Sequence, residues 1–111
     1  MLGMMLTISG HEVLETGNGI EALRVASSEL PDVAVVDIAL PGIDGYEVAR
    51  RLRADPGTSS IALIALSGYG QEEDRRCAYE AGFDVHFVKP VDSVRLSETI
   101  ARIGRPHSST A

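Results

Sequence analysis

The sequence predicts an α/β domain in which helices cover both faces of a parallel sheet. Three short apolar and β-branched runs predict buried strands, at residues 33–36, 61–66 and 85–88. A segment of helical character follows each of them, at residues 45–54, 71–81 and 93–103. Because strands that alternate with helices pair in parallel through right-handed connections, this order implies three layers, helix on sheet on helix.

Local signals support these boundaries and add two elements upstream. Asp44 followed by Glu47 forms a capping-box pattern, and Gly82 suits a left-handed helix stop. Residues 11–15 alternate like a strand, and residues 21–28 form a helix that Pro31 ends. We further expect about two turns of helix in residues 1–9, which carry apolar side chains all round.

Composition bounds the class of protein. The 111 residues, 11.8 kDa, fit one domain, and 44% hydrophobic with 23% charged residues is ordinary for a folded soluble chain. A net charge of −6 and a pI near 4.9 disfavour nucleic acid and anionic membrane surfaces as partners. The single cysteine, Cys77, cannot form an internal disulfide, and no apolar run approaches the roughly 18 residues of a membrane helix. We therefore expect a cytoplasmic protein without a membrane segment.

Three polar residues mark a candidate site at the carboxyl ends of the predicted strands. Asp37, Ser67 and Lys89 each follow one of the three apolar runs. Ligands of open parallel sheets collect at this edge. A carboxylate beside an ammonium stays ionised and can act as a nucleophile, while hydroxyl and ammonium groups can hold phosphoryl oxygens. The trio suits phosphoryl transfer to Asp37.

Each member of the trio also has an ordinary structural interpretation. A lone Asp after a strand is usually a turn or cap residue, and a lone Ser carries even less information. Lys89 is more informative, because it is the one lysine among ten basic residues and lies between an apolar run and Pro90. The compact, flexible ammonium of a lysine binds other groups differently from the planar guanidinium of the arginines that make up the rest of the basic residues.

Three sequence blocks resemble receiver domains of two-component signalling, including those of hybrid histidine kinases. The blocks are residues 37–47, 65–68 and 88–90, and they occur in the family's order. The resemblance implies a flavodoxin-like fold in which Asp37 accepts a phosphoryl group from a histidine kinase or phosphotransfer protein. Ser67 and Lys89 would hold the acyl phosphate oxygens, and His86 would occupy the switch position. Mg²⁺ would bind Asp37 and the backbone carbonyl of Ala39.

The N-terminal residues differ from the pattern of this family. Receivers begin with a strand and two adjacent acids that bind Mg²⁺, whereas residues 1–10 contain no acid. We therefore expect a receiver domain over residues 1–104 that lacks its first strand, followed by a flexible tail at 105–111. One carboxylate is a poor Mg²⁺ site, so Mg²⁺ should bind weakly. The family commonly has a cis Lys-Pro bond, which predicts a cis Lys89-Pro90.

Two other functions remain open at this stage. The first is a receiver-like interaction module that works without phosphorylation. The second is an aspartate-nucleophile phosphatase of the haloacid dehalogenase type, although Ala39 stands where that family needs a second Asp. Downstream, a receiver would act on an output domain or protein.

The missing strand makes a prediction about assembly. In the flavodoxin-like order 2-1-3-4-5 it would lie between residues 11–15 and 33–36, and its loss would open the sheet. Either strand 11–15 moves over to pair with 33–36, or a second molecule donates a strand or its apolar N-terminal segment. Of these two, we favour a strand-swapped homodimer.

Overall fold

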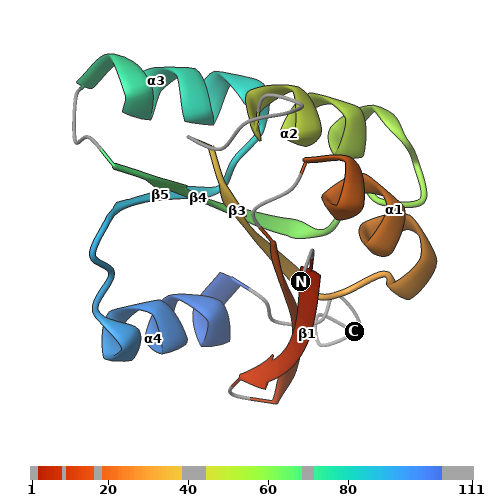
Figure 1. The fold of residues 1–111 in the computed structure, drawn as a ribbon, viewed down its shortest axis with the longest axis horizontal. Helices are drawn as coiled ribbons and strands as arrows, with labels where there is room; N and C mark the ends of the chain where they lie inside the picture. Colours follow the sequence, from red (N-terminus) through yellow and green to blue (C-terminus); the bar gives the residue numbers. More distant parts are fainter. Residues whose placement is uncertain (1–2, 9, 17–18, 39–44, 69–71, 104–111) are drawn as a thin grey trace.

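The fold was analysed in a computed structural model that describes residues 3–8, 10–16, 19–38, 45–68 and 72–103 (Figure 1). The strands are β1 Gly3–Ile8, β2 His11–Thr16, β3 Val33–Asp37, β4 Ala62–Ser67 and β5 Val85–Val88. The helices are α1 Gly19–Glu29, α2 Gly45–Ala54, α3 Glu72–Ala81 and α4 Ser93–Ile103. Each element predicted for residues 11–103 is present within about two residues of its expected bounds.

The strands form one sheet in the order β1-β2-β3-β4-β5. Neighbours from β2 to β5 are parallel, whereas β1 runs antiparallel to β2. Helices α1, α2 and α3 lie on one face of the sheet and α4 lies on the other (Figure 1). The three-layer α/β prediction is therefore confirmed.

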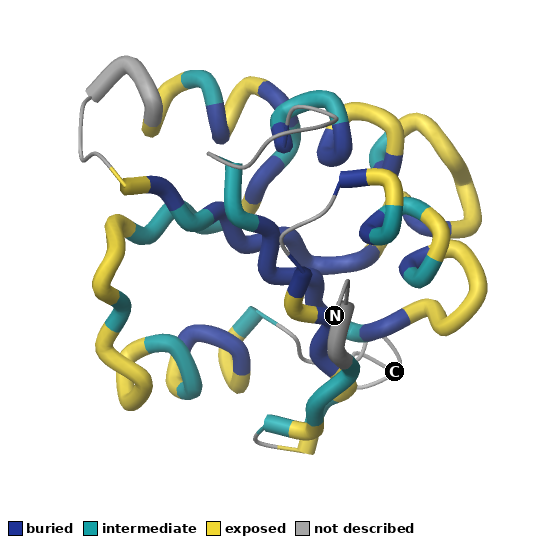
Figure 2. The backbone as a smooth tube through the Cα atoms, in the orientation of Figure 1, coloured by how far each residue is buried: buried dark blue, intermediate teal, exposed yellow. Residues whose placement is uncertain are grey.

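Successive strand residues point to opposite faces and build two cores. In β3, Ala34 and Val36 belong to the core under α1, α2 and α3, while Val33 and Val35 belong to the core under α4. Strands β3 and β4 are almost wholly buried, whereas β2 and β5 are partly exposed, and the outer helix faces and loops carry most of the exposed residues (Figure 2). This explains the continuous apolar runs that the sequence shows in the central strands β3 and β4.

The prediction of a helix in residues 1–9 is wrong, because residues 3–8 form strand β1. The segment turns back on β2 through a two-residue connection, with Ile8 opposite His11 and Gly10 at φ +81°. Met5 packs against the core under α1, and Ile8 against the core under α4. Because both faces of β1 pack against a core, apolar residues occur at successive positions and do not alternate with polar ones.

The expected gap in the sheet is closed within one chain. β2 pairs directly with β3, from Val13 opposite Val33 to Thr16 opposite Val36. This is the first of the two routes weighed above, in which the local strand moves over. The opening that motivated strand exchange is consequently not present between these strands. Residues 105–111, predicted to form a tail, lie outside the described residues.

The stop predicted for α3 is confirmed. Gly82 has φ +119°, and the N–H of Phe83 donates to the carbonyl of Ala78 at 3.0 Å. Only glycine suits this left-handed geometry without strain. Asp44, the predicted cap of α2, falls outside the residues described. No helix in the described ranges is long and apolar enough to cross a membrane.

Candidate functional site

The sheet brings the three predicted site residues to one edge. Asp37 is the last residue of β3, Ser67 is the last residue of β4, and Lys89 follows β5 directly. Backbone pairing fixes their relative positions: the N–H of Ile38 donates to Leu66 at 2.9 Å, and that of Lys89 donates to Ser67 at 2.8 Å. The convergence expected for the carboxyl ends of parallel strands is observed.

The side chains of Lys89 and Asp37 meet. The Lys89 ammonium donates a hydrogen bond to Oδ2 of Asp37 and forms an ion pair with it. The Asp37 side chain is 13% exposed and that of Lys89 is 43% exposed, so an incoming group can reach the pair from solvent. The Lys89-Pro90 bond is cis, as the resemblance implied.

Ser67 and His86 form a second polar pair, which joins β4 to β5. Ser67 is 3% exposed, and its Oγ lies 3.0 Å from Nε2 of His86. Ser67 is opposite Val88 in the β4–β5 register, so His86, two residues earlier on β5, points to the same face of the sheet. The structure thus joins the predicted switch residue to the hydroxyl at the carboxyl end of β4.

The described residues do not form a magnesium site. No group of three or more His, Cys, Asp or Glu side chains in the described ranges is placed to hold a metal ion. Asp37 supplies one carboxylate, and that carboxylate is engaged by an ammonium. Mg²⁺ usually takes one or two carboxylates together with phosphate and water. Ala39, whose carbonyl was the other expected ligand, lies outside the described residues.

These features suit one kind of chemistry. A partly shielded carboxylate that an ammonium keeps ionised can act as a nucleophile. The ammonium and a nearby hydroxyl can stabilise negative charge that arrives with an electrophile. An arrangement of this kind is chemically suited to accepting a phosphoryl group.

Comparison with known proteins decides the family. Residues 1–101 match the family described as "Response regulator receiver domain". The chain belongs to this family. Receiver domains are phosphoacceptor modules of two-component signalling, so this chain is a signalling domain of that class and not a member of a catalytic family.

Individual receivers resemble this one over most of its length. Protein PilH of Pseudomonas aeruginosa is 37% identical over 99 residues, which are 89% of this chain and 82% of PilH. The structure of a putative response regulator from Chloroflexus aurantiacus has a TM-score of 0.76 and 31% identity, covering 82% of this chain and 75% of that one.

One structural neighbour bears on metal binding. The receiver domain of sensor histidine kinase PA1611 from Pseudomonas aeruginosa has a TM-score of 0.73 and 28% identity, covering 82% of this chain and 75% of that one. Its structure has a magnesium ion coordinated in the active site cleft. The receiver described here shares that fold, and its described residues include no group of three or more His, Cys, Asp or Glu side chains placed to hold a metal ion.

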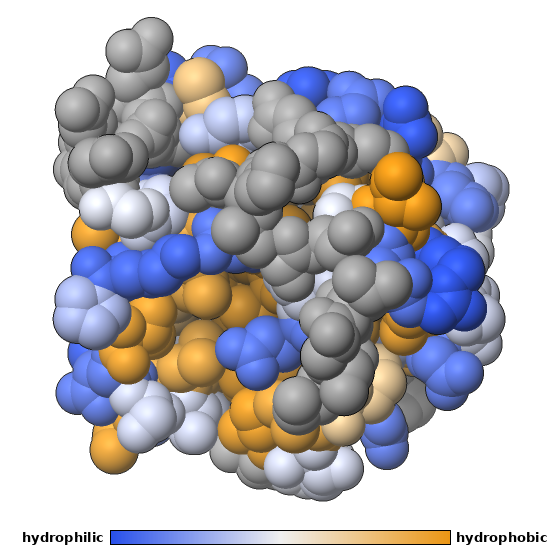
Figure 3. All heavy atoms as spheres, in the orientation of Figure 1, coloured by the Kyte–Doolittle hydropathy of each residue, from blue (hydrophilic) through white to orange (hydrophobic). Residues whose placement is uncertain are grey.

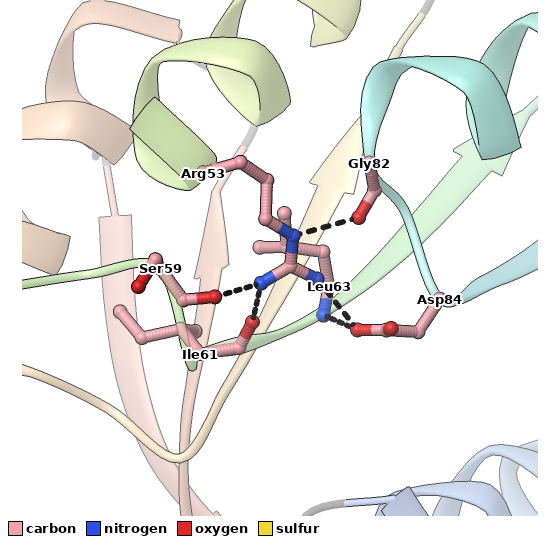
Figure 4. A network of polar contacts seen from close by, with 6 residues as sticks. All are labelled: Arg53, Ser59, Ile61, Leu63, Gly82 and Asp84. Carbon is pink, nitrogen blue, oxygen red and sulfur yellow. Dashed lines mark hydrogen bonds and ion pairs between the residues drawn. The ribbon is translucent and has the colours of Figure 1, made fainter. Parts of the chain in front are cut away.

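Sequence reasoning missed a second ion pair at the opposite end of the strands. Arg53 of α2 donates to the carbonyls of Ser59, Ile61 and Gly82 at 2.7, 2.6 and 3.0 Å (Figure 4). Its remaining nitrogen donates to Oδ2 of Asp84 at 2.8 Å, and that oxygen also accepts the N–H of Leu63 at 2.8 Å. Arg53 thus ties α2 to the starts of β4 and β5 and to the end of α3.

The sequence favours a solvated face for all the arginines of α2, and this holds for two of them. Arg50 and Arg51 are exposed and pair with Glu47. Arg53 is different, since its side chain is 26% exposed. It follows the buried Ala49 by one helical turn and therefore continues the buried stripe of α2. The spacing of four residues from Ala49 was the sequence signal that could have identified Arg53 as partly buried.

Proposed function

We propose that Asp37 is the phosphoacceptor of this receiver domain. The observation that carries the proposal is the ion pair between Lys89 and Asp37 at the carboxyl ends of β3 and β5. An oxygen of Asp37 attacks phosphorus in a phosphohistidine of a histidine kinase or phosphotransfer protein. A P–O bond forms, the P–N bond breaks, and the histidine nitrogen leaves with the electron pair.

Lys89 and Ser67 have separate roles in this step. The Lys89 ammonium offsets the charge that the phosphoryl group brings to Asp37. The Ser67 hydroxyl has one proton, and in the structure it is engaged with His86. To donate its proton to a phosphoryl oxygen, the Ser67 hydroxyl has two options. It can rotate away from His86, or it can keep the contact by accepting a hydrogen bond from the imidazole N–H. Phosphorylation would thereby move the Ser67–His86 pair and report to the face of α3.

Magnesium is proposed as a weak ligand here. Receivers of this family use Mg²⁺, as the PA1611 neighbour illustrates, and bound Mg²⁺ neutralises charge on a transferring phosphoryl group. The residues described for this chain do not supply the ligands for tight binding. We expect Mg²⁺ affinity and phosphorylation rate to lie well below those of receivers that have the acidic pair.

The remaining parts of the proposal concern location and partners. The protein works in the cytoplasm with a histidine kinase or phosphotransfer protein upstream and an output domain or protein downstream. It makes no direct contact with nucleic acid, which its net charge of −6 would repel. The proposal also includes self-association as a homodimer.

Intact-mass spectrometry tests the phosphoacceptor assignment. The chain is incubated with acetyl phosphate and excess Mg²⁺, beside its Asp37→Asn variant. We expect the wild type to gain the mass of one phosphoryl group and the variant to gain none, because an amide cannot form the acyl phosphate. Equal incorporation would refute the assignment, and no incorporation in either would favour the phosphorylation-independent interaction module. Steady release of phosphate from monoesters would favour the phosphatase.

A further inference from the structure

Strand β1 forms an edge of the sheet that is suited to pairing. Among the described strands its one neighbour is β2, to which it is registered without interruption from Gly3 opposite Thr16 to Ile8 opposite His11. The register contains no bulge that would twist the edge away. The second edge of β1 therefore presents backbone groups that the sheet does not pair.

Natural edge strands usually carry a protecting feature, such as a lysine, another charge, a proline or a bulge. The six residues of β1, GMMLTI, include neither a charged residue nor a proline. The opposite edge, β5, is only four residues long and leads directly into Lys89 and Pro90. The two edges of the sheet therefore differ, and β1 is the one without protection.

Hairpin geometry identifies the backbone groups that face outward. Ile8 and His11 flank a two-residue connection, so they form the pair that exchanges hydrogen bonds. Because antiparallel ladders alternate, the N–H and C=O groups of Thr7 and Met5 then point away from β2. Thr7 is also exposed, so the outer edge is accessible at that position.

We propose that β1 pairs antiparallel with β1 of a second copy of this chain, giving a continuous ten-stranded sheet across a two-fold axis. The outward groups of Met5 and Thr7 complement each other when the axis passes through Leu6. Because β1 carries no charge, the pairing brings no like charges together, although each chain has a net charge of −6. A second copy is thus the partner whose edge fits.

Side-chain chemistry favours the same arrangement. Leu6 is half-buried opposite Val13, and Ile8 is half-buried against the core under α4. That core is covered by a single helix, and Figure 3 shows apolar surface beside α4 and over the β1–β2 hairpin. Placing the two Leu6 side chains against each other extends this apolar face across the axis and removes it from water.

This arrangement differs from a strand-swapped dimer in a measurable way. In a swapped dimer β1 pairs with β2 of the other copy, and the groups of Met5 and Thr7 still face solvent. In the edge-paired dimer they are hydrogen-bonded, while β1 keeps its own β2. Amide exchange at single residues therefore separates the two.

The first experiment needs no variant. Amide exchange is followed by NMR at low micromolar and at millimolar protein, with mass measured by light scattering in parallel. We expect the mass to rise toward twice 11.8 kDa, and the amides of Met5 and Thr7 to become protected as it does, while those of Leu6 and Ile8 are protected throughout. A constant mass of one chain overturns the proposal. So does a doubled mass with Met5 and Thr7 still exchanging freely.

The second experiment uses a matched pair of substitutions. Thr7→Pro removes the outward N–H yet suits an edge strand whose N–H faces solvent, and Thr7→Val keeps the N–H and the strand preference. We expect Thr7→Pro to raise the dimer dissociation constant about tenfold or more and Thr7→Val to leave it unchanged. Circular dichroism confirms that both are folded. Equal dimerisation of the two folded variants contradicts edge pairing, and the exchange measurement stands independently if Thr7→Pro does not fold.

Discussion

Two of the carboxylate–cation pairs of this receiver, Asp37–Lys89 and Asp84–Arg53, lie at opposite ends of the parallel sheet. Asp37 and Lys89 meet where the strands end, and Asp84 and Arg53 meet where β4 and β5 begin. Arg53 makes four hydrogen bonds, three of them to backbone carbonyls, whereas Lys89 presents an ammonium that is 43% exposed. The Arg53–Asp84 pair therefore connects segments of the backbone, whereas the Lys89–Asp37 pair remains accessible to an incoming group.

The choice of cation matches this division. A planar guanidinium offers several donors in fixed directions, which suits the convergent carbonyls around Arg53. A single ammonium on a flexible chain can follow a carboxylate and an added phosphoryl group without a fixed geometry. The one lysine of the chain is at the candidate site, and the half-buried structural position is occupied by an arginine.

The largest contrast is expected between variants of the two aspartates. Asp37→Asn should abolish phosphoryl incorporation and change the free energy of unfolding by about 1 kcal/mol or less, because exposed ion pairs contribute little. Asp84→Ala should retain incorporation and cost about 2–3 kcal/mol, since it leaves the N–H of Leu63 and a nitrogen of Arg53 without their acceptor. Mass spectrometry and urea unfolding measure both. Loss of incorporation in folded Asp84→Ala would break the proposed separation.

Replacing the lysine sharpens the functional end of the comparison. Lys89→Met should lower the phosphorylation rate by about 100-fold, the usual cost of removing one charge-stabilising donor, and leave stability nearly unchanged. Rates come from intact-mass time courses with acetyl phosphate. Lys89→Arg serves as the control that restores charge but not shape, and it should recover only part of the rate. A rate in Lys89→Met equal to that of the wild type would remove Lys89 from the site.

Replacing the arginine sharpens the structural end. Arg53→Met should reduce the free energy of unfolding by about 2–4 kcal/mol, because several part-buried carbonyls lose their donor. Arg50→Met, on the exposed face of the same helix, should stay within about 0.5 kcal/mol. Chemical unfolding followed by circular dichroism provides both values. Similar losses in the two variants would show that the network around Arg53 is not special.

Helices α2 and α3 should differ in local stability. α2 buries Val48 and Leu52, whereas the residues that α3 is described as burying are the small Ala78 and Ala81. Amide exchange should be faster in α3 than in α2, and Arg53→Met should widen the difference because Arg53 holds the carbonyl of Gly82 after α3. Hydrogen exchange with mass spectrometry tests this. Equal protection of both helices would show that α3 is no less stable locally than α2.

The smallest effect should come from the surface of α2. Hydrogen bonds from Arg51 and Arg50 lower the pKa of Glu47 below its ordinary 4.5. A carboxyl with a lowered pKa in the folded state stabilises the fold above the unfolded pKa, and this is lost as pH falls through the folded pKa. Thermal unfolding from pH 6 to pH 3 should show a slight loss in the wild type near and below 4.5 that Glu47→Gln lacks. Identical profiles would show that this surface pairing adds nothing.

Much of the fold could be predicted because its signals are local. The apolar runs around Val35, Ile64 and Phe87 are longer than an exposed strand would carry, and Gly82 marks the end of α3. The residues at the carboxyl ends of those runs must share an edge once the strands are parallel. Arg53 was harder, because its partners are carbonyls from segments distant in the sequence and any residue type can supply a carbonyl.

The resemblance to receiver domains implied a switch position for His86, whereas the sequence by itself determined the α/β class and the convergence of Asp37, Ser67 and Lys89. These follow from alternation along each strand and from the common direction of parallel strands, which need no knowledge of distant contacts. Only the tertiary structure decided that residues 3–8 form a strand and that β2 lies against β3. A short apolar segment fits a helix or a strand equally well, and which one forms depends on whether a sheet edge is free to pair with it.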